Sequence, residues 1–260
     1  MSALLLDLDG VLYVGDEPVA GAAEAVAWIR RRGIAHLFLT NTTSRPREAL
    51  VDKLGRMGIA VAAEDILTPP VAAVQWLRSH AHGPVALFVP EATRAEFAGL
   101  DLLPAQAQSG AAAVVIGDLG EGWDFPTLNR AFRLLMADPR PPLVALGMTR
   151  YWRAPDGLRL DVGAFAHALS YAAGVDPVVL GKPAEPFFRV ALDRLGVSAG
   201  ETWMIGDDIR GDVQGAQRAG LRGALVRTGK FQPSDLNSGI RPDAVLDSIA
   251  DLPRWWERVG

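Results

Sequence analysis

The stretch Leu4-Leu5-Leu6-Asp7-Leu8-Asp9-Gly10 decides the fold. Consecutive leucines are typical of a strand that is buried on both faces of a parallel sheet, and glycine marks the turn after it. An acid that directly follows such a strand lies at the carboxyl edge of the sheet, where open α/β folds place their ligand sites. We therefore expect a buried first strand that brings Asp7 and Asp9 to a functional edge.

Helix-like and strand-like segments alternate along the rest of the chain. The first helix is expected to close with Arg30-Arg31-Arg32 and to stop at Gly33, because basic residues and a following glycine are typical of helix C-termini. Further strands are expected at residues 35–39, 85–89, 113–116, 143–146, 178–180, 202–205 and 224–226, and further helices at residues 44–57, 71–77, 94–100, 128–136, 164–173, 183–195, 213–219 and 249–256. This order predicts an α/β protein with parallel sheets that are covered on both faces.

Two breaks interrupt the alternation, at His80-Ala81-His82-Gly83-Pro84 and at Gly174-Val175-Asp176-Pro177. They indicate that one domain is inserted into another. We expect a Rossmann-like catalytic core at residues 1–79 and 178–260 and an inserted α/β cap domain at residues 80–177. The two histidines lack further ligands nearby, which favours a polar hinge over a metal site.

Composition excludes several classes of protein. The 260 residues are 49% hydrophobic and 22% charged with a net charge of −4, which is ordinary for a globular domain and excludes a disordered chain. The absence of a basic block argues against nucleic-acid or membrane partners. There is no cysteine, so disulfides and thiolate metal sites are excluded. The first residues do not resemble a signal peptide, and we expect a cytoplasmic protein.

Four clusters of polar residues each follow a predicted strand, and the topology of a parallel sheet brings such positions to one edge. They are Asp7 with Asp9, Thr40 with Asn41, Lys182, and Asp207 with Asp208 and Asp212. Ionised carboxylates at close range repel one another, and a hard dication such as Mg²⁺ removes that repulsion. Lys182 and the hydroxyl of Thr40 are suited to holding phosphate oxygens. The set predicts phosphoryl transfer, with Asp7 as a nucleophile and Asp9 in place to move a proton.

Each of these residues has a simpler interpretation when it is taken alone. Asp7 fits a turn, Thr40-Asn41 fits a cap, Lys182 fits a solvated lysine at a helix start, and Asp212 fits a helix N-terminus. Their occurrence together, in this order, favours the catalytic interpretation. Tyr151 and Trp152 are residue types that more often pack than contact a substrate, and their role in the cap stays open between the two. Trp255 and Trp256 are expected to anchor the last helix.

The ordered motifs resemble those of the haloacid dehalogenase superfamily. They are Asp7-Leu8-Asp9-Gly10-Val11-Leu12, Thr40-Asn41, Gly181-Lys182-Pro183 and Gly206-Asp207-Asp208-Ile209-Arg210-Gly211-Asp212. The long insert after the second motif is similar to subclass IIA, whose members carry a large α/β cap there. The segments Arg150-Tyr151-Trp152-Arg153 and Val226-Arg227-Thr228-Gly229-Lys230 resemble a group within it that acts on phospholysine, phosphohistidine and pyrophosphate.

The resemblance implies a role for each position. Asp7 is the nucleophile and a metal ligand, Asp9 is the general acid and base and binds the metal through its carbonyl, and Asp207 is the remaining ligand. Thr40, Asn41 and Lys182 hold the phosphoryl group, and Asp208 and Asp212 support the site. The substrate is a small phosphorylated molecule and the cofactor is Mg²⁺, with a homodimer through the cap. Some animal members of the closer group have Ser at the position of Asp9.

Other functions remain open at this stage. Hydrolysis of P–N or pyrophosphate bonds and a nucleotide phosphatase are alternatives within the same chemistry. A phosphoryl-accepting signalling module also groups acids, a hydroxyl and a lysine, but it needs only one compact domain. A nucleotide-binding protein is disfavoured, because Gly206 and Gly211 have P-loop spacing while Asp212 stands where the loop requires Lys.

Overall fold

A computed structural model of the chain describes residues 2–154 and 156–259. It contains two compact units, of which unit 1 is Met1–Thr40, Arg47–Leu67 and Lys182–Gly260, and unit 2 is Asn41–Pro46 and Thr68–Gly181. The bounds differ from the expected domain limits, because residues 41–46, 68–79 and 178–181 belong to unit 2. Helix α3 (Pro69–His80) contacts the turn Ala95–Phe97, which explains its place in that unit.

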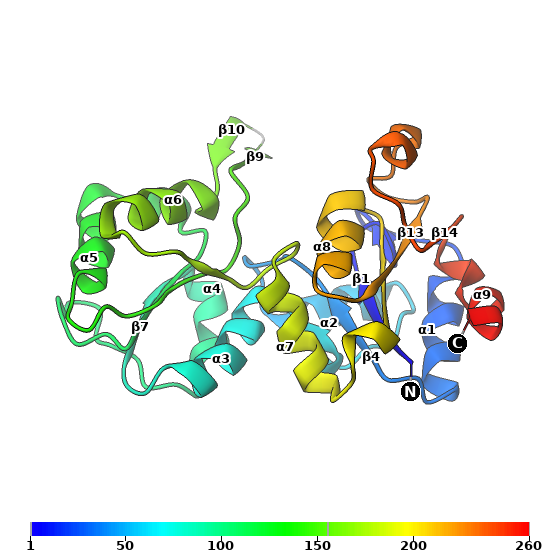
Figure 1. Cartoon of the computed structure of the whole chain (residues 1–260), viewed down its shortest axis with the longest axis horizontal. Helices are drawn as coiled ribbons and strands as arrows, with labels where there is room; N and C mark the ends of the chain where they lie inside the picture. Colours follow the sequence, from blue (N-terminus) through cyan, green and yellow to red (C-terminus); the bar gives the residue numbers. More distant parts are fainter. Residues whose placement is uncertain (1, 155, 260) are drawn as a thin grey trace. The chain divides into compact units, whose positions relative to one another are not determined.

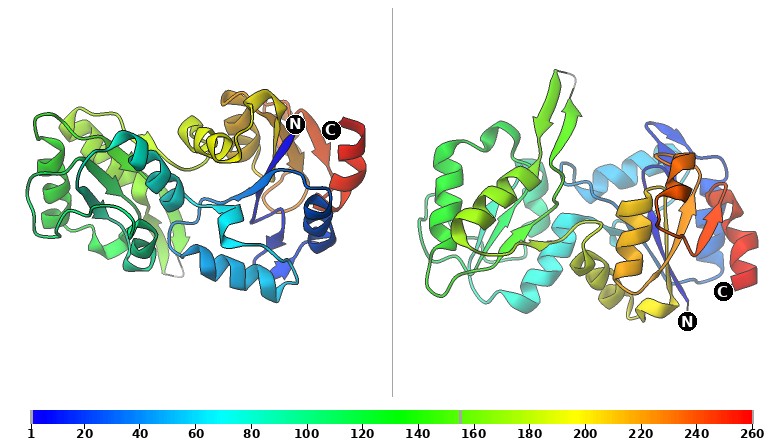
Figure 2. Two further views of the ribbon diagram at one scale, coloured as in Figure 1. Left: turned by 90° about the horizontal axis from the view of Figure 1, so that it is seen from below. Right: turned by 45° about the horizontal axis from the view of Figure 1, so that its top comes forward.

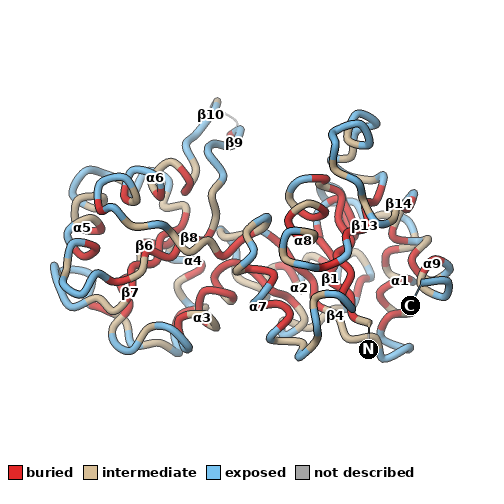
Figure 3. The backbone as a smooth tube through the Cα atoms, in the orientation of Figure 1, coloured by how far each residue is buried: buried red, intermediate tan, exposed pale blue. Residues whose placement is uncertain are grey.

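Unit 1 is built on a six-stranded sheet in which every neighbouring pair is parallel, in the order β14-β13-β12-β1-β4-β5. The strands are β1 (Ala3–Asp7), β4 (His36–Leu39), β5 (Ile66–Leu67), β12 (Thr202–Gly206), β13 (Arg222–Val226) and β14 (Ala244–Leu246). All five residues of β1 are buried at the centre of the sheet, as the leucine run predicts (Figure 3). The central strand therefore ends at Asp7.

Helices cover both faces of this sheet (Figure 1). One face packs against α1 (Ala22–Arg31), α2 (Arg47–Arg56) and α9 (Leu252–Val259), and the other carries α7 (Glu185–Leu195) and α8 (Gly215–Arg218). Trp255 of α9 lies edge-on to Trp203 of β12 with ring centroids 4.7 Å apart, which confirms that it anchors the last helix. A short hairpin, β2 (Tyr13–Val14) and β3 (Glu17–Pro18), follows β1.

The helix expected at 213–219 differs in the structure. A π-helix at Ile209–Gln214 precedes α8, and the N–H of Val213 donates to the carbonyl of Asp208 five residues earlier. Single π turns are frequent at functional sites. Asp212 lies in this wider turn, so its position depends on the π-helix.

Unit 2 has its own four-stranded parallel sheet in the order β11-β8-β7-β6. Its strands are β6 (Val85–Phe88), β7 (Ala113–Ile116), β8 (Leu143–Ala145) and β11 (Val178–Val179), and its helices include α3, α4 (Glu91–Arg94), α5 (Phe125–Leu135) and α6 (Val162–Ala173). In place of the helix expected at 94–100, the one-turn helix α4 ends at Arg94 and is followed by the 3-10 turn Ala95–Phe97. The expected α/β fold is confirmed in both units.

The hairpin of β9 (Tyr151–Ala154) and β10 (Gly157–Leu160) extends out from the rest of unit 2 (Figure 2). Tyr151 and Trp152 are about half exposed on it. The two side chains therefore do not pack in the core of unit 2, the interpretation that residue type alone favours, because this antiparallel hairpin leaves them in solvent. Across the described ranges, none of the helices combines the length and apolar character that crossing a bilayer requires.

Candidate active site

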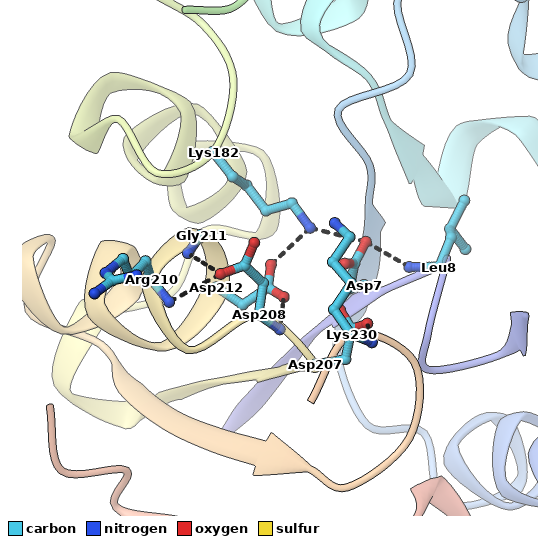
Figure 4. A network of polar contacts seen from close by, with 9 residues as sticks. All are labelled: Asp7, Leu8, Lys182, Asp207, Asp208, Arg210, Gly211, Asp212 and Lys230. Carbon is cyan, nitrogen blue, oxygen red and sulfur yellow. Dashed lines mark hydrogen bonds and ion pairs between the residues drawn. The ribbon is translucent and has the colours of Figure 1, made fainter. Parts of the chain in front are cut away.

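Two neighbouring strands bring Asp7 and Asp207 together. Leu6 of β1 pairs in register with Ile205 of β12, so Asp7 and Asp207, which lie just beyond these residues, emerge at the same carboxyl edge. Both are buried. Lys182 precedes α7, and Asp212 comes from the π-helix that follows β12 (Figure 4). All four residues belong to unit 1.

Lys182 links two of these acids. Its Nζ lies 2.8 Å from Oδ1 of Asp7 and 2.7 Å from Oδ1 of Asp212. The side chains of Lys182, Asp7 and Asp212 are only 5%, 8% and 1% exposed. The N–H of Leu8 also donates to Oδ1 of Asp7, at 2.7 Å. Lys182 is therefore a buried partner of the carboxylates and not a solvated lysine.

The electrostatics show an excess of negative charge. Burial raises the pKa of Asp7 above its usual range although Lys182 opposes the shift. Burial likewise raises the pKa of Asp212 to about 6, and the nearby Asp7 adds to that effect. Burial would lower the pKa of Lys182, but Asp212 and Asp7 outweigh it and raise that pKa. The ammonium of Lys182 does not neutralise both of the carboxylates that it contacts.

Asp207 has one oxygen bound by the protein and one without a partner. Its Oδ2 accepts a 2.6 Å hydrogen bond from the backbone N–H of Lys230. Its Oδ1 is buried and accepts no hydrogen bond from the residues that the structure describes. Burial raises the pKa of Asp207, since desolvation penalises the charged form.

These features fit a hard divalent cation. Asp7, Asp207 and Asp212 each offer one carboxylate oxygen, and the three oxygens lie within 4.8 Å of one another. Oxygen ligands, surplus negative charge and the unpartnered Oδ1 of Asp207 match what Mg²⁺ requires. Asp212, predicted as a supporting residue, is part of this group, whereas the side chain of Asp9 is exposed and lies outside it.

The remaining predicted residues hold different positions. Thr40 is buried just after β4, where its N–H donates to the carbonyl of Leu67. Asn41 is exposed and belongs to unit 2. Asp208 caps the π-helix, because its Oδ1 accepts from the N–H groups of Arg210 and Gly211 at 2.9 and 2.8 Å. Asp208 therefore supports the turn that carries Asp212.

The segment Thr228-Gly229-Lys230 contacts the site but had no predicted role. Gly229 has φ +63°, and a Cβ at this position would overlap the carboxylate of Asp207. The segment was singled out only by its resemblance to related proteins, which gave it no role, and its local pattern of a glycine between polar residues directly after a strand is typical of any turn. Contact with Asp207 depends on the pairing of β12 with β13, which the local sequence does not determine.

Comparison with known proteins agrees with the fold. Residues 4–102 match the family described as haloacid dehalogenase-like hydrolase, and residues 179–252 match the one described as HAD-hydrolase-like. Over 253 residues the chain is 41% identical to phospholysine phosphohistidine inorganic pyrophosphate phosphatase of Rattus norvegicus, covering 95% of this chain and 91% of that protein.

Comparison with solved structures also finds similar proteins. A hypothetical protein of Pyrococcus horikoshii OT3 superposes with a TM-score of 0.87 at 26% identity, covering 98% of this chain and all of the other. The p-nitrophenyl phosphatase of Archaeoglobus fulgidus gives 0.84 at 27% identity, covering 98% of each chain. Together with the buried acids and Lys182, these findings define an α/β phosphatase. The chain belongs to the haloacid dehalogenase-like hydrolase family.

Proposed function

We propose that this phosphatase is Mg²⁺-dependent and works through an aspartyl-phosphate on Asp7. The observation that carries the proposal is the position of Asp7, which is buried at the end of the central strand, bound to Lys182 and within ligand distance of two further acids. Asp7, Asp207 and Asp212 would hold or surround the ion. When bound, Mg²⁺ supplies positive charge that lowers the repulsion between the carboxylates and the phosphoryl oxygens.

The chain's own residues account for the two chemical steps. A carboxylate oxygen of Asp7 attacks phosphorus, the bond from phosphorus to the leaving oxygen breaks, and Asp9 gives that oxygen its proton. Asp9 then takes a proton from water, the water oxygen attacks phosphorus, and the bond to Asp7 breaks to release phosphate. Lys182 would hold the phosphoryl oxygens, and Thr40, which is buried and follows β4 at the carboxyl edge of the same sheet, would donate its hydroxyl to them.

The presence of Asp9 favours phosphomonoesters as substrates. An alkoxide leaving group needs a proton from the enzyme, and an exposed carboxyl group two residues after the nucleophile supplies a suitable donor. A small phosphorylated metabolite is therefore the leading candidate. Hydrolysis of phosphoramidates or pyrophosphate is the second candidate, and it is favoured by the 41% identity to the rat enzyme. A homodimer through unit 2 stays a prediction.

The phosphoenzyme can be tested by acid quench. Wild-type protein mixed with ³²P-labelled p-nitrophenyl phosphate and Mg²⁺ is expected to yield labelled protein that hydroxylamine releases, as for an acyl-phosphate. Asp7→Asn is expected to lose both the label and turnover, by at least about 10³-fold, while keeping the wild-type circular dichroism spectrum. Asp9→Asn is expected to accumulate label, because its second step lacks a base. Label that persists on Asp7→Asn would overturn the assignment.

Substrate class is tested separately with a panel of alkyl phosphates, p-nitrophenyl phosphate, pyrophosphate, phospholysine and phosphohistidine. If alkyl phosphates are the substrates, Asp9→Asn reduces kcat/KM for them far more than for p-nitrophenyl phosphate, whose leaving group needs little protonation. Higher wild-type kcat/KM for the P–N or P–O–P compounds than for any ester would favour the second candidate.

A further inference from the structure

The loop after β13 contacts two separate parts of the site. The hydroxyl of Thr228 donates to the carbonyl oxygen of Gly10, which directly follows Asp9. Two residues later, the N–H of Lys230 donates to Oδ2 of Asp207 at 2.6 Å. One short segment therefore connects the turn after β1 with the carboxylate after β12.

Close packing reinforces these two hydrogen bonds. Gly10 has φ +85° and Gly229 has φ +63°, both in the left-handed region that favours glycine. A Cβ on either residue would overlap Oδ2 of Asp207, and one on Gly229 would also overlap the Cα of Gly10. The backbones of both loops thus approach Asp207 so closely that no side chain fits between them.

This enclosure fixes the orientation of the Asp207 carboxylate. Its Oδ2 is held by the Lys230 N–H between the two glycines, so rotation of the carboxylate would break that bond. Its Oδ1 is buried and accepts no hydrogen bond within the described part of the chain. The same contacts therefore leave one oxygen oriented and available to a cation.

The turn after Asp9 is held from both sides as well. The N–H of Gly10 donates to the carbonyl of Tyr13 at 2.7 Å, and the carbonyl of Gly10 accepts from Thr228. In a trans peptide the N–H and the preceding carbonyl point in opposite directions. The bond to Tyr13 therefore also sets the direction of the Asp9 carbonyl, and Thr228 keeps the turn in place.

We propose that Thr228 is a positioning residue, whose hydroxyl ties the Asp9-Gly10 turn to the 228–230 loop and thereby holds Asp207 in the orientation that binds Mg²⁺. The inference rests on the proposed function and assigns to this loop a role in metal affinity. The hydroxyl of Thr228 bonds to the carbonyl of Gly10, which takes no part in the two chemical steps. Loss of this hydroxyl is therefore expected to weaken metal binding and to leave the affinity for substrate unchanged.

The experiment compares Thr228→Val, which keeps the shape and loses the donor, with Thr228→Ser, which keeps the donor. Mg²⁺ binding to the full-length protein is measured by isothermal titration calorimetry without substrate. The Val variant is expected to bind Mg²⁺ about five- to tenfold more weakly, the loss typical of one hydrogen bond, and the Ser variant to bind within twofold of wild type. In kinetics, the Mg²⁺ concentration for half-maximal rate rises, while KM for p-nitrophenyl phosphate stays within twofold.

Further variants keep the test decisive. Lys230→Ala retains the backbone N–H and removes a positive charge near Asp207, so it is expected to bind Mg²⁺ at least as tightly as wild type, which separates the loop backbone from the lysine charge. If Thr228→Val does not fold, Thr228→Ala replaces it. If the variant without the hydroxyl, Thr228→Val or Thr228→Ala, has lower thermal stability but wild-type Mg²⁺ affinity, the inference is overturned, because the hydroxyl then has a purely structural role. A wild-type protein that takes up no Mg²⁺ would overturn the proposed function itself.

Discussion

The ammonium of Lys182 lies 2.8 Å from the carboxylate of Asp7, and both side chains are almost fully buried. The same ammonium lies 2.7 Å from Asp212. Burial raises the pKa of both acids, because desolvation penalises their charged forms. The two carboxylates share one cation and therefore keep a surplus negative charge. Lys182 therefore stabilises the fold of the site before any substrate binds.

Replacing Lys182 with Met is expected to destabilise unit 1 in a pH-dependent manner. Removal of one partner leaves buried carboxylates uncompensated, which costs about 3–5 kcal/mol. The folded-state pKa values of Asp7 and Asp212, already above the usual range of an aspartate, rise further without Lys182. The loss is therefore larger at pH 7.5 than at pH 5, where the acids are protonated more readily. Urea unfolding without Mg²⁺ at the two pH values measures it.

Arg189→Met serves as the matched control. Arg189 forms an exposed ion pair with Glu185 at 2.6 Å on α7, and such surface pairs contribute about 0–1 kcal/mol. Its effect is expected to be small at both pH values. An equal loss for Lys182→Met at pH 5 and pH 7.5 would contradict the electrostatic explanation.

Stabilisation by Mg²⁺ is expected to increase with pH. Burial raises the pKa of Asp212 to about 6 and also raises the pKa values of Asp7 and Asp207. For an acid whose folded pKa is raised, stability is highest at low pH and falls as pH rises from the unfolded value through the folded one. A cation that competes with these protons binds better at higher pH. The Mg²⁺-induced rise in Tm should therefore be greater at pH 7.5 than at pH 5.

Asp207→Asn provides the control for this effect, because it keeps the shape of Asp207 and removes one charge. Its Mg²⁺-induced rise in Tm is expected to be much smaller at pH 7.5, with K⁺ at matched ionic strength giving none in either protein. A rise in Tm for the wild type that is equal at both pH values would show that these acids do not bind the ion.

The sequence predicted the sheet edge better than the way its residues interact. Asp7 and Asp207 follow apolar runs whose strand character is local, so their convergence follows from parallel topology alone. The pairing of Lys182 with Asp212 could not be predicted in the same way. It depends on a π turn, and the local pattern of 213–219 is that of an ordinary helix. The resemblance to related proteins singled out the segment of Thr228 and Gly229 but gave it no role, since Thr228 bonds to Gly10, more than 200 residues away, and Gly229 packs against both Gly10 and Asp207.

The limits of the inserted unit were also predicted only in part, because they depend on tertiary contacts as well as on local sequence. Loop signals located its boundaries near residues 80 and 177, but α3 joins unit 2 through contacts with the turn Ala95–Phe97. A helix beside a boundary has an apolar face that fits either unit equally well in sequence. Only tertiary packing decides which unit buries it.

Gly206→Ala is expected to destabilise the protein strongly. A Cβ at Gly206 would overlap the Cβ and carboxylate of Asp212, which is buried and cannot move without breaking its bond to Lys182. Overpacking of this kind costs about 1–3 kcal/mol, and activity is expected to fall with it. Gly55→Ala, on an exposed position of α2 with no atom near its Cβ, should instead stabilise by about 0.5–1 kcal/mol. Thermal unfolding of both variants without Mg²⁺ tests this, and a Gly206→Ala protein as stable as the wild type would refute the close approach.

Trp152→Ala is expected to leave stability almost unchanged, although tryptophan usually contributes much to a core. Trp152 is 42% exposed on the β9–β10 hairpin, beside Tyr151 at 51%. Trp123 offers a control in the same unit, because its ring stacks between Phe88 and Phe165 at 5.8 and 5.0 Å and its Nε1 donates to the carbonyl of Gly117. Trp123→Ala should cost about 3–5 kcal/mol, and Trp152→Ala less than about 0.5 kcal/mol. Equal losses in the two variants would mean that Trp152 is buried after all. Such a difference would show that Trp152 contributes little to stability, so a change in kcat/KM for this variant would not be a consequence of unfolding.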